Sequence, residues 1–561
     1  MSDNGAEINP SLETKMDMLE PKVDIHGTCY TLVQRTELVT ALLLTLIIVF
    51  LHFIFMGNAG ALWRDEVSTF NVATRPSISE VWRSLIWHPF PIFTSMVLRL
   101  WTAAVGGSDF RLRVFGFLVG ISILGCLWLN ARLLTRSVPL LSLVLLALNP
   151  LAIQIGDSIR PYGMGYFFIL LAFAFIWKVT DQPNILKIIV ATLAAVLSVQ
   201  FLLHNAFLLM AIIFAGVIVT LRRGCWKRSV LLIAMGVVAA ISLLPYRQIF
   251  REAQQWSALT KDPVTFLWIL KVFSQALAAP GQFMLGIWIC LFILGIAAAV
   301  YLQFSRSPDF SKTERDFVLF CSIVMVASIS LLVILYKLIS ISTKPWYYLP
   351  SVVLTAASLD AILRKKGQIV TVFRITLAIF IVVFSWSAVW QKVHTRQTNL
   401  DIIASRLERS ANKNDMILLH PWFYAVAFQQ YYHGPIAFMT IPPIDDFKVH
   451  RYDLVKGKMA SDDPLQPVLD RMTETLMSGR SIWLVGDTDL PLKEQSPCFL
   501  PPAPHTVYGW RLSQYMKCWW EQAGCFINSH SLERAALQPV IDKPINPNED
   551  CHIRLIRGWR P

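Results

Sequence analysis

Long apolar runs separated by short polar connections make up most of the first 390 residues of the chain. A helix that crosses a membrane needs roughly 20 apolar residues, within a range of about 17 to 25. Eleven runs approach or reach this length: 38–56, 110–133, 138–155, 162–177, 185–201, 206–221, 230–245, 284–304, 317–338, 347–363 and 369–390. The pattern predicts a polytopic α-helical membrane domain over residues 38–394, with about 11 transmembrane helices.

The charge of the connections indicates an orientation. If residues 1–37 are a cytoplasmic N-terminal arm, every second connection is basic; these are 132–136, 178–187, 222–228, 306–315 and 364–366. Basic loops remain in the cytoplasm. We therefore expect loops 57–109 and 246–283, and the whole chain after residue 391, on the outer side, most simply of a bacterial inner membrane.

Composition narrows the classes of protein that fit. Only 16% of the 561 residues are charged and 55% are hydrophobic, which excludes a wholly water-soluble enzyme and a disordered chain. After residue 394 there are 18 basic and 18 acidic residues, so the net charge of +13 lies entirely in the hydrophobic part. That distribution argues against a nucleic-acid-binding tail.

The tail over residues 395–561 is predicted to be a separate extracytoplasmic α/β domain. Short apolar segments at 416–420, 436–439 and 481–485 alternate with amphipathic helical patterns at 423–432 and 464–477, which is typical of a small α/β unit. Four cysteines lie close to the C-terminus, at Cys498, Cys518, Cys525 and Cys551. In an outward-facing domain they predict two disulfides, in any of three pairings.

The first outer loop, 57–109, carries the candidate chemistry. Asp65 and Glu66 follow the first apolar run. The pair also fits an ordinary helix start without a catalytic role, because acidic residues favour helix N-termini. Two amphipathic stretches, 67–87 and 92–105, are joined through His88 and residues 89–91. Helices of this kind lie along a membrane surface, so we expect them to cover a cavity there.

These segments resemble a known family. The sequence RDEVSTFNVATRPSISEVW (64–82), followed by HPFPIFTSMVLRLWTAAVGGSDFRLRVFGFLVG (88–120), is similar to the first external loop of C-type (GT-C) glycosyltransferases. Within that family, the segments resemble the protein O-mannosyltransferases and the lipid A aminoarabinose transferases. Residues 149–150, 157–162, 344–350 and 415–424 match further family segments in the same order. The resemblance covers about residues 38–440.

The resemblance implies a reaction and roles for individual residues. The donor would be a sugar on a polyprenyl phosphate, and the acceptor an envelope glycan, a lipid or a protein. Asp65 would be the base in an inverting single displacement, and Glu66 would hold the acceptor or tune Asp65. No cofactor is favoured, although Asp65, Glu66 and Asp157 are suitable ligands for a divalent cation. The remaining implied ligands are Arg160 and Lys344 for the donor phosphate, and His88, Tyr162, Tyr347 and Tyr348 for substrate.

Simpler interpretations stand beside these roles. Arg160 and Lys344 also suit membrane anchors, and the tyrosines suit an interfacial aromatic belt. A transporter or flippase has the same hydropathy, but its charges would lie near the middle of the membrane, often in two related halves. A non-catalytic scaffold that displays the α/β domain, and an oligosaccharide ligase with a lipid-diphosphate donor, are also compatible with the sequence.

Overall fold

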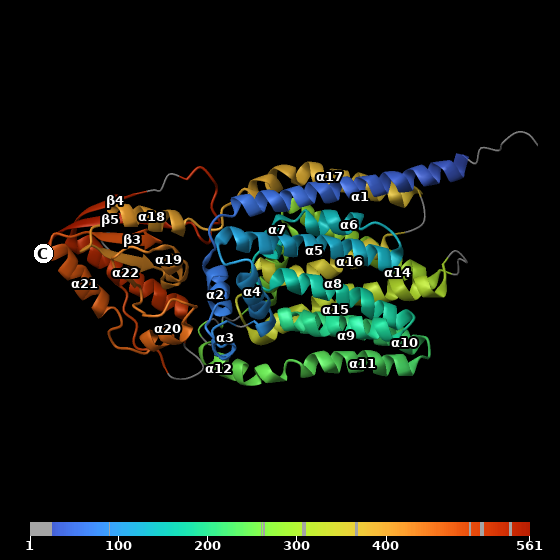
Figure 1. Ribbon diagram of the computed structural model, residues 1–561, viewed down its shortest axis with the longest axis horizontal. Coiled ribbons are helices and arrows are strands. Elements are labelled where there is room, and N and C mark those ends of the chain that lie inside the picture. Colours follow the sequence, from blue (N-terminus) through green and yellow to red (C-terminus); the bar gives the residue numbers. More distant parts are fainter. Residues whose placement is uncertain are drawn as a thin grey trace, which may run out of the picture.

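The computed structural model describes residues 25–88, 90–257, 259, 261, 264–305, 310–364, 368–492, 495–504, 510–537 and 541–561. Figure 1 shows a bundle of long helices, with a smaller part containing a β-sheet at one end. Residues 1–24 of the predicted cytoplasmic arm lie outside the described residues, as do 306–309 and 365–366 of the basic connections.

Among the described residues, eight helical stretches are long and apolar enough to cross a membrane. They are α1 (Ile25–Asn58), α5 (Asp109–Thr135), α8 (Tyr162–Asp181), α10 (Asn205–Arg222), α11 (Trp226–Ile241) continuing into α12 (Arg247–Ser257), α14 (Gln282–Phe304), α15 (Lys312–Ile339) and α17 (Gln368–Val393). Large apolar side chains such as Leu46, Phe214 and Ile293 are exposed on them, which suits a surface that faces lipid. The chain is a polytopic helical membrane protein, as predicted.

The other three predicted runs form shorter elements. Run 138–155 is divided into α6 (Leu140–Ser142), a π-helical turn η2 (Leu143–Ala147) and α7 (Pro150–Gly156). The division falls before Pro150, which cannot continue a helix, and the Asn149 side chain caps α7 by accepting from two backbone N–H groups. Run 185–201 is α9 (Ile185–Phe201), and run 347–363 is η5 (Pro345–Tyr348) with the largely buried α16 (Leu349–Ile362).

Three short helices cover the end of the bundle that carries the sheet, and we call them the roof: α2 (Arg64–Ala73), α3 (Ile78–Ser84) and α4 (Ile92–Ala104). The predicted amphipathic stretch 67–87 is two helices rather than one. Pro76 lies in the turn between them, and the Ser77 hydroxyl starts α3 by accepting from the backbone N–H of Glu80. A further short apolar helix, α13 (Phe266–Leu277), lies in the second predicted outer loop.

The C-terminal part is an α/β domain with a five-stranded sheet in the order β2-β1-β3-β5-β4. Strands β2 (Phe438–Thr440), β1 (Met416–His420) and β3 (Ile482–Gly486) are parallel, whereas β5 (His552–Trp559) and β4 (Ser531–Ala536) join as antiparallel neighbours. The first three match the predicted strands, and β4 and β5 were not predicted. The accompanying helices are α18 (Leu400–Ser410), α19 (Ala425–Tyr431), α20 (Tyr452–Met459), α21 (Gln466–Met477) and α22 (Leu512–His530).

One of the two expected disulfides is present in the structure. It joins Cys498 to Cys518 at the start of α22. Cys525 and Cys551 are free thiols. Cys551 is buried, and the Asn399 side chain accepts from its backbone N–H and donates to its carbonyl. The Cys525 thiol instead donates to the Gln495 carbonyl. The expectation of a second bridge is therefore wrong, because these two thiols have different neighbours.

The roof and the α/β domain share one buried core. Leu62, Val67 and Leu98 belong to the same apolar cluster as the sheet residues Ile417 and Leu484. The Tyr431 hydroxyl, at the end of α19, accepts from the Leu62 backbone N–H at 2.7 Å and donates to the Asp109 carboxylate at 2.9 Å. The α/β domain is thus packed onto the roof rather than tethered to it.

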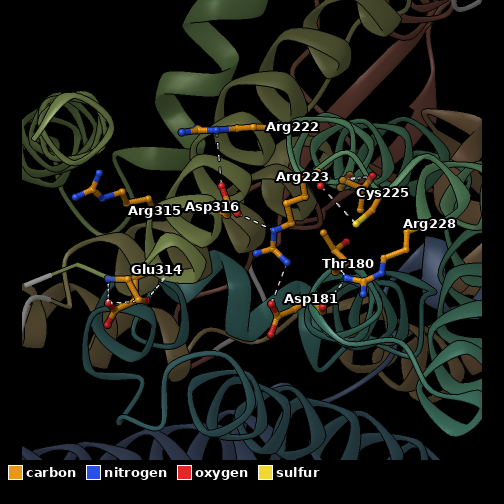
Figure 2. Close-up of polar contacts among 12 residues, drawn as sticks. Thr180, Asp181, Arg222, Arg223, Cys225, Arg228, Glu314, Arg315 and Asp316 are labelled. Atoms are coloured by element: carbon orange, nitrogen blue, oxygen red, sulfur yellow. Dashed lines mark hydrogen bonds and ion pairs between the residues drawn. The ribbon is translucent and has the colours of Figure 1, made fainter. Parts of the chain in front are cut away.

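The opposite end of the bundle is held by a network of ion pairs, shown in Figure 2. Arg223 bonds Asp316 of α15 at 2.7 Å and Asp181 of α8 at 3.0 Å. Arg228 of α11 donates to the backbone carbonyls of Thr180 and Asp181. Four helices are connected here, far from the roof. Arg223 and Arg228 of the basic connection 222–228 therefore hold these helices together.

Candidate active site

Asp65 occupies the second position of α2, directly under the junction of bundle and α/β domain. One of its carboxylate oxygens lies 2.8 Å from a guanidinium nitrogen of Arg160, and the other lies 3.7 Å from Nε2 of His450. Burial opposes ionisation of this carboxyl, but Arg160, His450 and Arg64 together lower its pKa below the usual value. The side chain is 23% exposed, so Asp65 is an ionised carboxylate that a ligand can reach.

Arg160 is surrounded by aromatic rings. Its guanidinium carbon lies 5.5 Å from the ring centre of Trp63, 5.3 Å from Phe90 and 5.2 Å from Tyr162. Such contacts favour a planar cation. The Nε group of Arg160 forms no hydrogen bond within the described part of the chain. The arginine is therefore fixed in position while keeping donor capacity beyond its pair with Asp65.

The turn that carries Arg160 is anchored inside the bundle. His52 of α1 contacts both carboxylate oxygens of Asp157 at 2.8 Å, and both side chains are buried. Gly120 of α5 allows this contact, since a Cβ there would lie 2.0 Å from the Asp157 carboxylate and 2.7 Å from His52. This buried pair fixes the backbone three residues before Arg160.

Glu66 lies in a different environment from Asp65. Its fully buried carboxylate bonds Arg113 of α5 at 2.8 Å and the backbone N–H of Ile159 at 3.3 Å. Arg113 also donates to the carbonyls of Gly60 and Ala61. Glu66 therefore joins the roof to α5 and to the Arg160 turn, a position suited to holding the site together rather than to contacting the acceptor.

Arg64 connects the site to the α/β domain. It forms an ion pair with Glu549, donates to the Asn548 carbonyl at 2.9 Å and stacks on Phe423 at 4.6 Å. Burial, partly offset by Arg64, raises the pKa of Glu549 to about 7. The sequence interpretation missed both Glu549 and His450. Both follow residue 440, where the family resemblance ends, and no periodic pattern marks either.

His88 and the predicted tyrosines have different surroundings. His88 is buried, with Nε2 lying 3.4 Å from the Thr69 hydroxyl, and burial together with Arg160 lowers its pKa to about 3. Tyr162 stacks on Tyr347, with ring centres 6.5 Å apart, so both lie on the Arg160 side. Tyr348 points elsewhere, because its hydroxyl bonds Thr343 at 2.9 Å and its ring packs on Phe273. The residue after His88, Pro89, lies outside the described residues.

Lys344 lines a neighbouring pocket of about 640 Å³ between α7, α13, α17 and η5. Lys271 and Lys392 line the same pocket, which has no carboxylate among its lining residues. Neither Asp65 nor Arg160 belongs to that lining. Trp346 forms part of the wall and meets Trp63 edge to face, with ring centres 6.4 Å apart. The structure thus brings Asp65 and Arg160 into contact. Lys344 instead lines the neighbouring pocket, whose wall includes Trp346.

Comparison with known proteins identifies the fold. The chain matches no protein-family model and no curated protein. It is similar to the solved structure of ArnT from Cupriavidus metallidurans in the apo state, with a TM-score of 0.51 and 11% sequence identity over 79% of this chain and 92% of that chain. The undecaprenyl-phosphate-bound form of ArnT gives 0.49 and 13% over the same shares. An oligosaccharyltransferase from Archaeoglobus fulgidus, tethered with an acceptor peptide, gives 0.46 and 11% over 90% and 73%.

The likeness to apo ArnT shows that the two proteins share a fold. In this chain the fold is a polytopic helical bundle that carries a roof of short helices and a C-terminal α/β domain. The predicted resemblance is therefore confirmed at the level of the fold.

Proposed function

We propose that this protein is a membrane glycosyltransferase. It moves a sugar from a polyprenyl-phosphate donor to a hydroxyl or phosphate acceptor at the outer face of a bacterial inner membrane. The observation that carries the proposal is the partly exposed, ionised Asp65, which is paired with a caged Arg160 beside a pocket lined by three lysines. The shared fold with apo ArnT supports the general class.

The lysine pocket suits the donor phosphate. Three ammonium groups with no carboxylate among the lining residues create a site for an anion. The pocket lies where the apolar helix α17 and the α/β residue Asn548 meet, so a lipid tail can remain against the bundle while the head group stays at the surface. Arg160 does not line this pocket, so in the proposed complex the phosphate extends past Trp346 and meets Arg160 at the edge of the pocket.

Asp65 acts as the base. The acceptor oxygen forms a bond to the anomeric carbon as its proton passes to Asp65, and the bond from that carbon to the phosphate oxygen breaks with its electron pair. The phosphate that leaves gains negative charge, which Arg160 stabilises, while Lys344 contributes to binding the phosphate. A single displacement of this kind inverts the anomeric carbon. No metal ion takes part in the proposed reaction, so excess EDTA should leave transfer unchanged.

The resting ion pair gives the mechanism an order. While Arg160 bonds Asp65 at 2.8 Å, the carboxylate is partly neutralised and is a weaker base. A donor phosphate that competes for Arg160 releases Asp65 at the moment the sugar is in place. The base is therefore strongest in the complex that can react, which limits wasteful hydrolysis.

A transfer assay tests the function. Purified protein in proteoliposomes is given a panel of polyprenyl-phosphate sugars and envelope extracts, and the products are identified by mass spectrometry. We expect sugar transfer that D65N reduces by about 100-fold or more, with donor binding retained. The matched variant D470N, at an exposed position of α21, should leave transfer unchanged. Movement of intact donor across the bilayer, without cleavage of the sugar–phosphate bond, would support a flippase instead.

A further inference from the structure

We propose that a second pocket, between the end of α2 and α19, binds the acceptor through an anionic sugar unit that bears a phosphate or a carboxylate. This anionic group is an anchor and is distinct from the acceptor atom that attacks the donor. The inference rests on the proposed function and assigns a role to the α/β domain.

The lining of this pocket is polar and basic. Its volume is about 260 Å³, and its lining residues are Asn71, Thr74, Arg75, Pro76, Val426, Gln429, Gln430 and Lys448. Two of them are cations, four carry amide or hydroxyl groups, and none is acidic. Amides and hydroxyls both donate to and accept from sugar hydroxyls, whereas the cations select an oxyanion.

Both cations are available to a ligand. Within the part of the chain that the structure describes, the Arg75 guanidinium and the Lys448 ammonium form no hydrogen bond or ion pair, and the Arg75 Nε is buried without a partner. The neighbouring arginines of the site differ, because Arg64, Arg113 and Arg160 are each paired with a carboxylate. A buried N–H without a partner is costly, which is consistent with a ligand that completes it.

The pocket is connected to Asp65 on two sides. Helix α2 carries Asp65 at its start and Asn71 near its end, six residues or about 9 Å away. Across from it, the Asn71 side chain donates to the Lys448 carbonyl at 2.9 Å, and two residues further on His450 lies 3.7 Å from the Asp65 carboxylate. An acceptor anchored by Arg75 and Lys448 therefore has its adjoining part close to the base.

Direct binding tests the inference without requiring catalysis. The full-length protein in detergent is titrated with glucose 1-phosphate and with glucuronic acid, and neutral glucose is the comparison; saturation-transfer NMR reports binding. We expect saturable binding of the anionic sugars and at least about tenfold weaker binding of glucose. The phosphate and carboxylate arms show which oxyanion the pocket prefers. Equal binding of all three sugars, or no saturable binding of either anion, would overturn the proposal.

Variants locate the binding. R75Q/K448Q keeps both side chains polar but removes both charges, and it should weaken binding of the anionic sugar about tenfold or more. The matched control R409Q/K413Q removes two charges from α18 and the turn after it, and should bind as the unmodified protein does. Equal thermal unfolding of both variants shows that they are folded. Undiminished binding by folded R75Q/K448Q would contradict the assignment.

The two proposals fail in different ways. In the transfer assay, R75Q/K448Q should raise KM for the acceptor more than KM for the donor, whereas R409Q/K413Q should change neither value. If transfer occurs and the acceptor KM is unchanged, the pocket assignment is wrong and the proposed function stands. If no sugar is transferred by any form of the protein, the proposed function is wrong, whereas the sugar titration still decides whether the pocket binds an anionic sugar.

Discussion

Arg160 and Asp65, 95 residues apart in the sequence, form an ion pair of 2.8 Å at the base of the roof. The pair joins α2 to the turn before α8. Three aromatic rings around Arg160 and the His52–Asp157 contact behind it hold this geometry. The reaction proposed above depends on that single contact being exchanged for a phosphate.

Replacing Arg160 with lysine should therefore be costly. Lysine keeps the positive charge but loses the planar, multi-donor group that bonds Asp65 and a phosphate together and stacks on Trp63 and Tyr162. We expect kcat for transfer to fall roughly 100-fold, with a higher KM for the donor. Steady-state kinetics with the polyprenyl-phosphate sugar measure both values. R409K, at an exposed position of α18, is the control; equal losses in the two variants would refute the special role of Arg160.

The lysine pocket makes a separate prediction about donor affinity. Lys271, Lys344 and Lys392 are exposed side chains in its lining, so replacing all three with alanine should leave the fold intact. We expect the donor KM to rise about tenfold and kcat to change little, because weak ionic contacts to a phosphate mainly contribute binding. K312A/K413A, outside the pocket, is the comparison. A fall in kcat with an unchanged KM would place the lysines elsewhere in the mechanism.

Glu66 should act on stability rather than on substrate affinity. Removing one partner of a buried ion pair costs about 3 to 5 kcal/mol, and E66A would leave Arg113 unpaired in the core. We expect a lower midpoint of thermal unfolding for E66A, with partial recovery in the double variant E66L/R113M. If Glu66 instead holds the acceptor, E66A would raise the acceptor KM at an unchanged unfolding midpoint.

Buried histidines make stability depend on pH. Burial and Arg160 lower the pKa of His88 to about 3, and burial, against the attraction of Asp65, lowers that of His450 to about 4. In the unfolded chain both titrate near 6.5, so between about pH 4 and 6.5 the unfolded state binds protons that the folded state does not. Stability is full above about pH 6.5 and is lost as the pH falls, by about 2 kcal/mol per histidine at pH 5.

Thermal unfolding at pH 7 and pH 5 measures this effect. H450Q should reduce the difference between the two midpoints, whereas H552Q, which changes an exposed histidine, should not. Midpoints that do not change between the two pH values would show that these histidines take up protons in the folded state as readily as in the unfolded state.

Much of the fold was predictable because membrane spans are encoded locally. Each of the eleven apolar runs lies on a helical segment, since every backbone polar group in a membrane must be satisfied within its own segment. Strands β4 and β5 were missed: β4 carries exposed charges such as Glu533, and β5 alternates arginines with apolar residues at the C-terminus. Long-range pairing, which these strands require, leaves a weak local pattern.

The site was predicted only in part, for geometric reasons. The pairing of Asp65 with Arg160 follows the expectation that both lie at one face of the membrane. Glu66 departs from it because consecutive helical residues differ by about 100° in direction, which sends its side chain into the core. Lys344 was expected beside Arg160, but it lines a separate pocket, because the turn after it places Trp346 against Trp63. Such placements depend on tertiary packing that sequence spacing does not encode.

The buried core common to the roof and the sheet has a consequence for biosynthesis. Asp65 and its helix are synthesised early, yet Arg64 pairs with Glu549, which lies 485 residues later in the chain, and Leu62 and Val67 are covered by residues made hundreds of positions later. A truncated chain therefore carries an unfinished reaction centre with an open apolar surface. The proposed reaction centre therefore cannot form before the α/β domain has been synthesised and has packed on the roof.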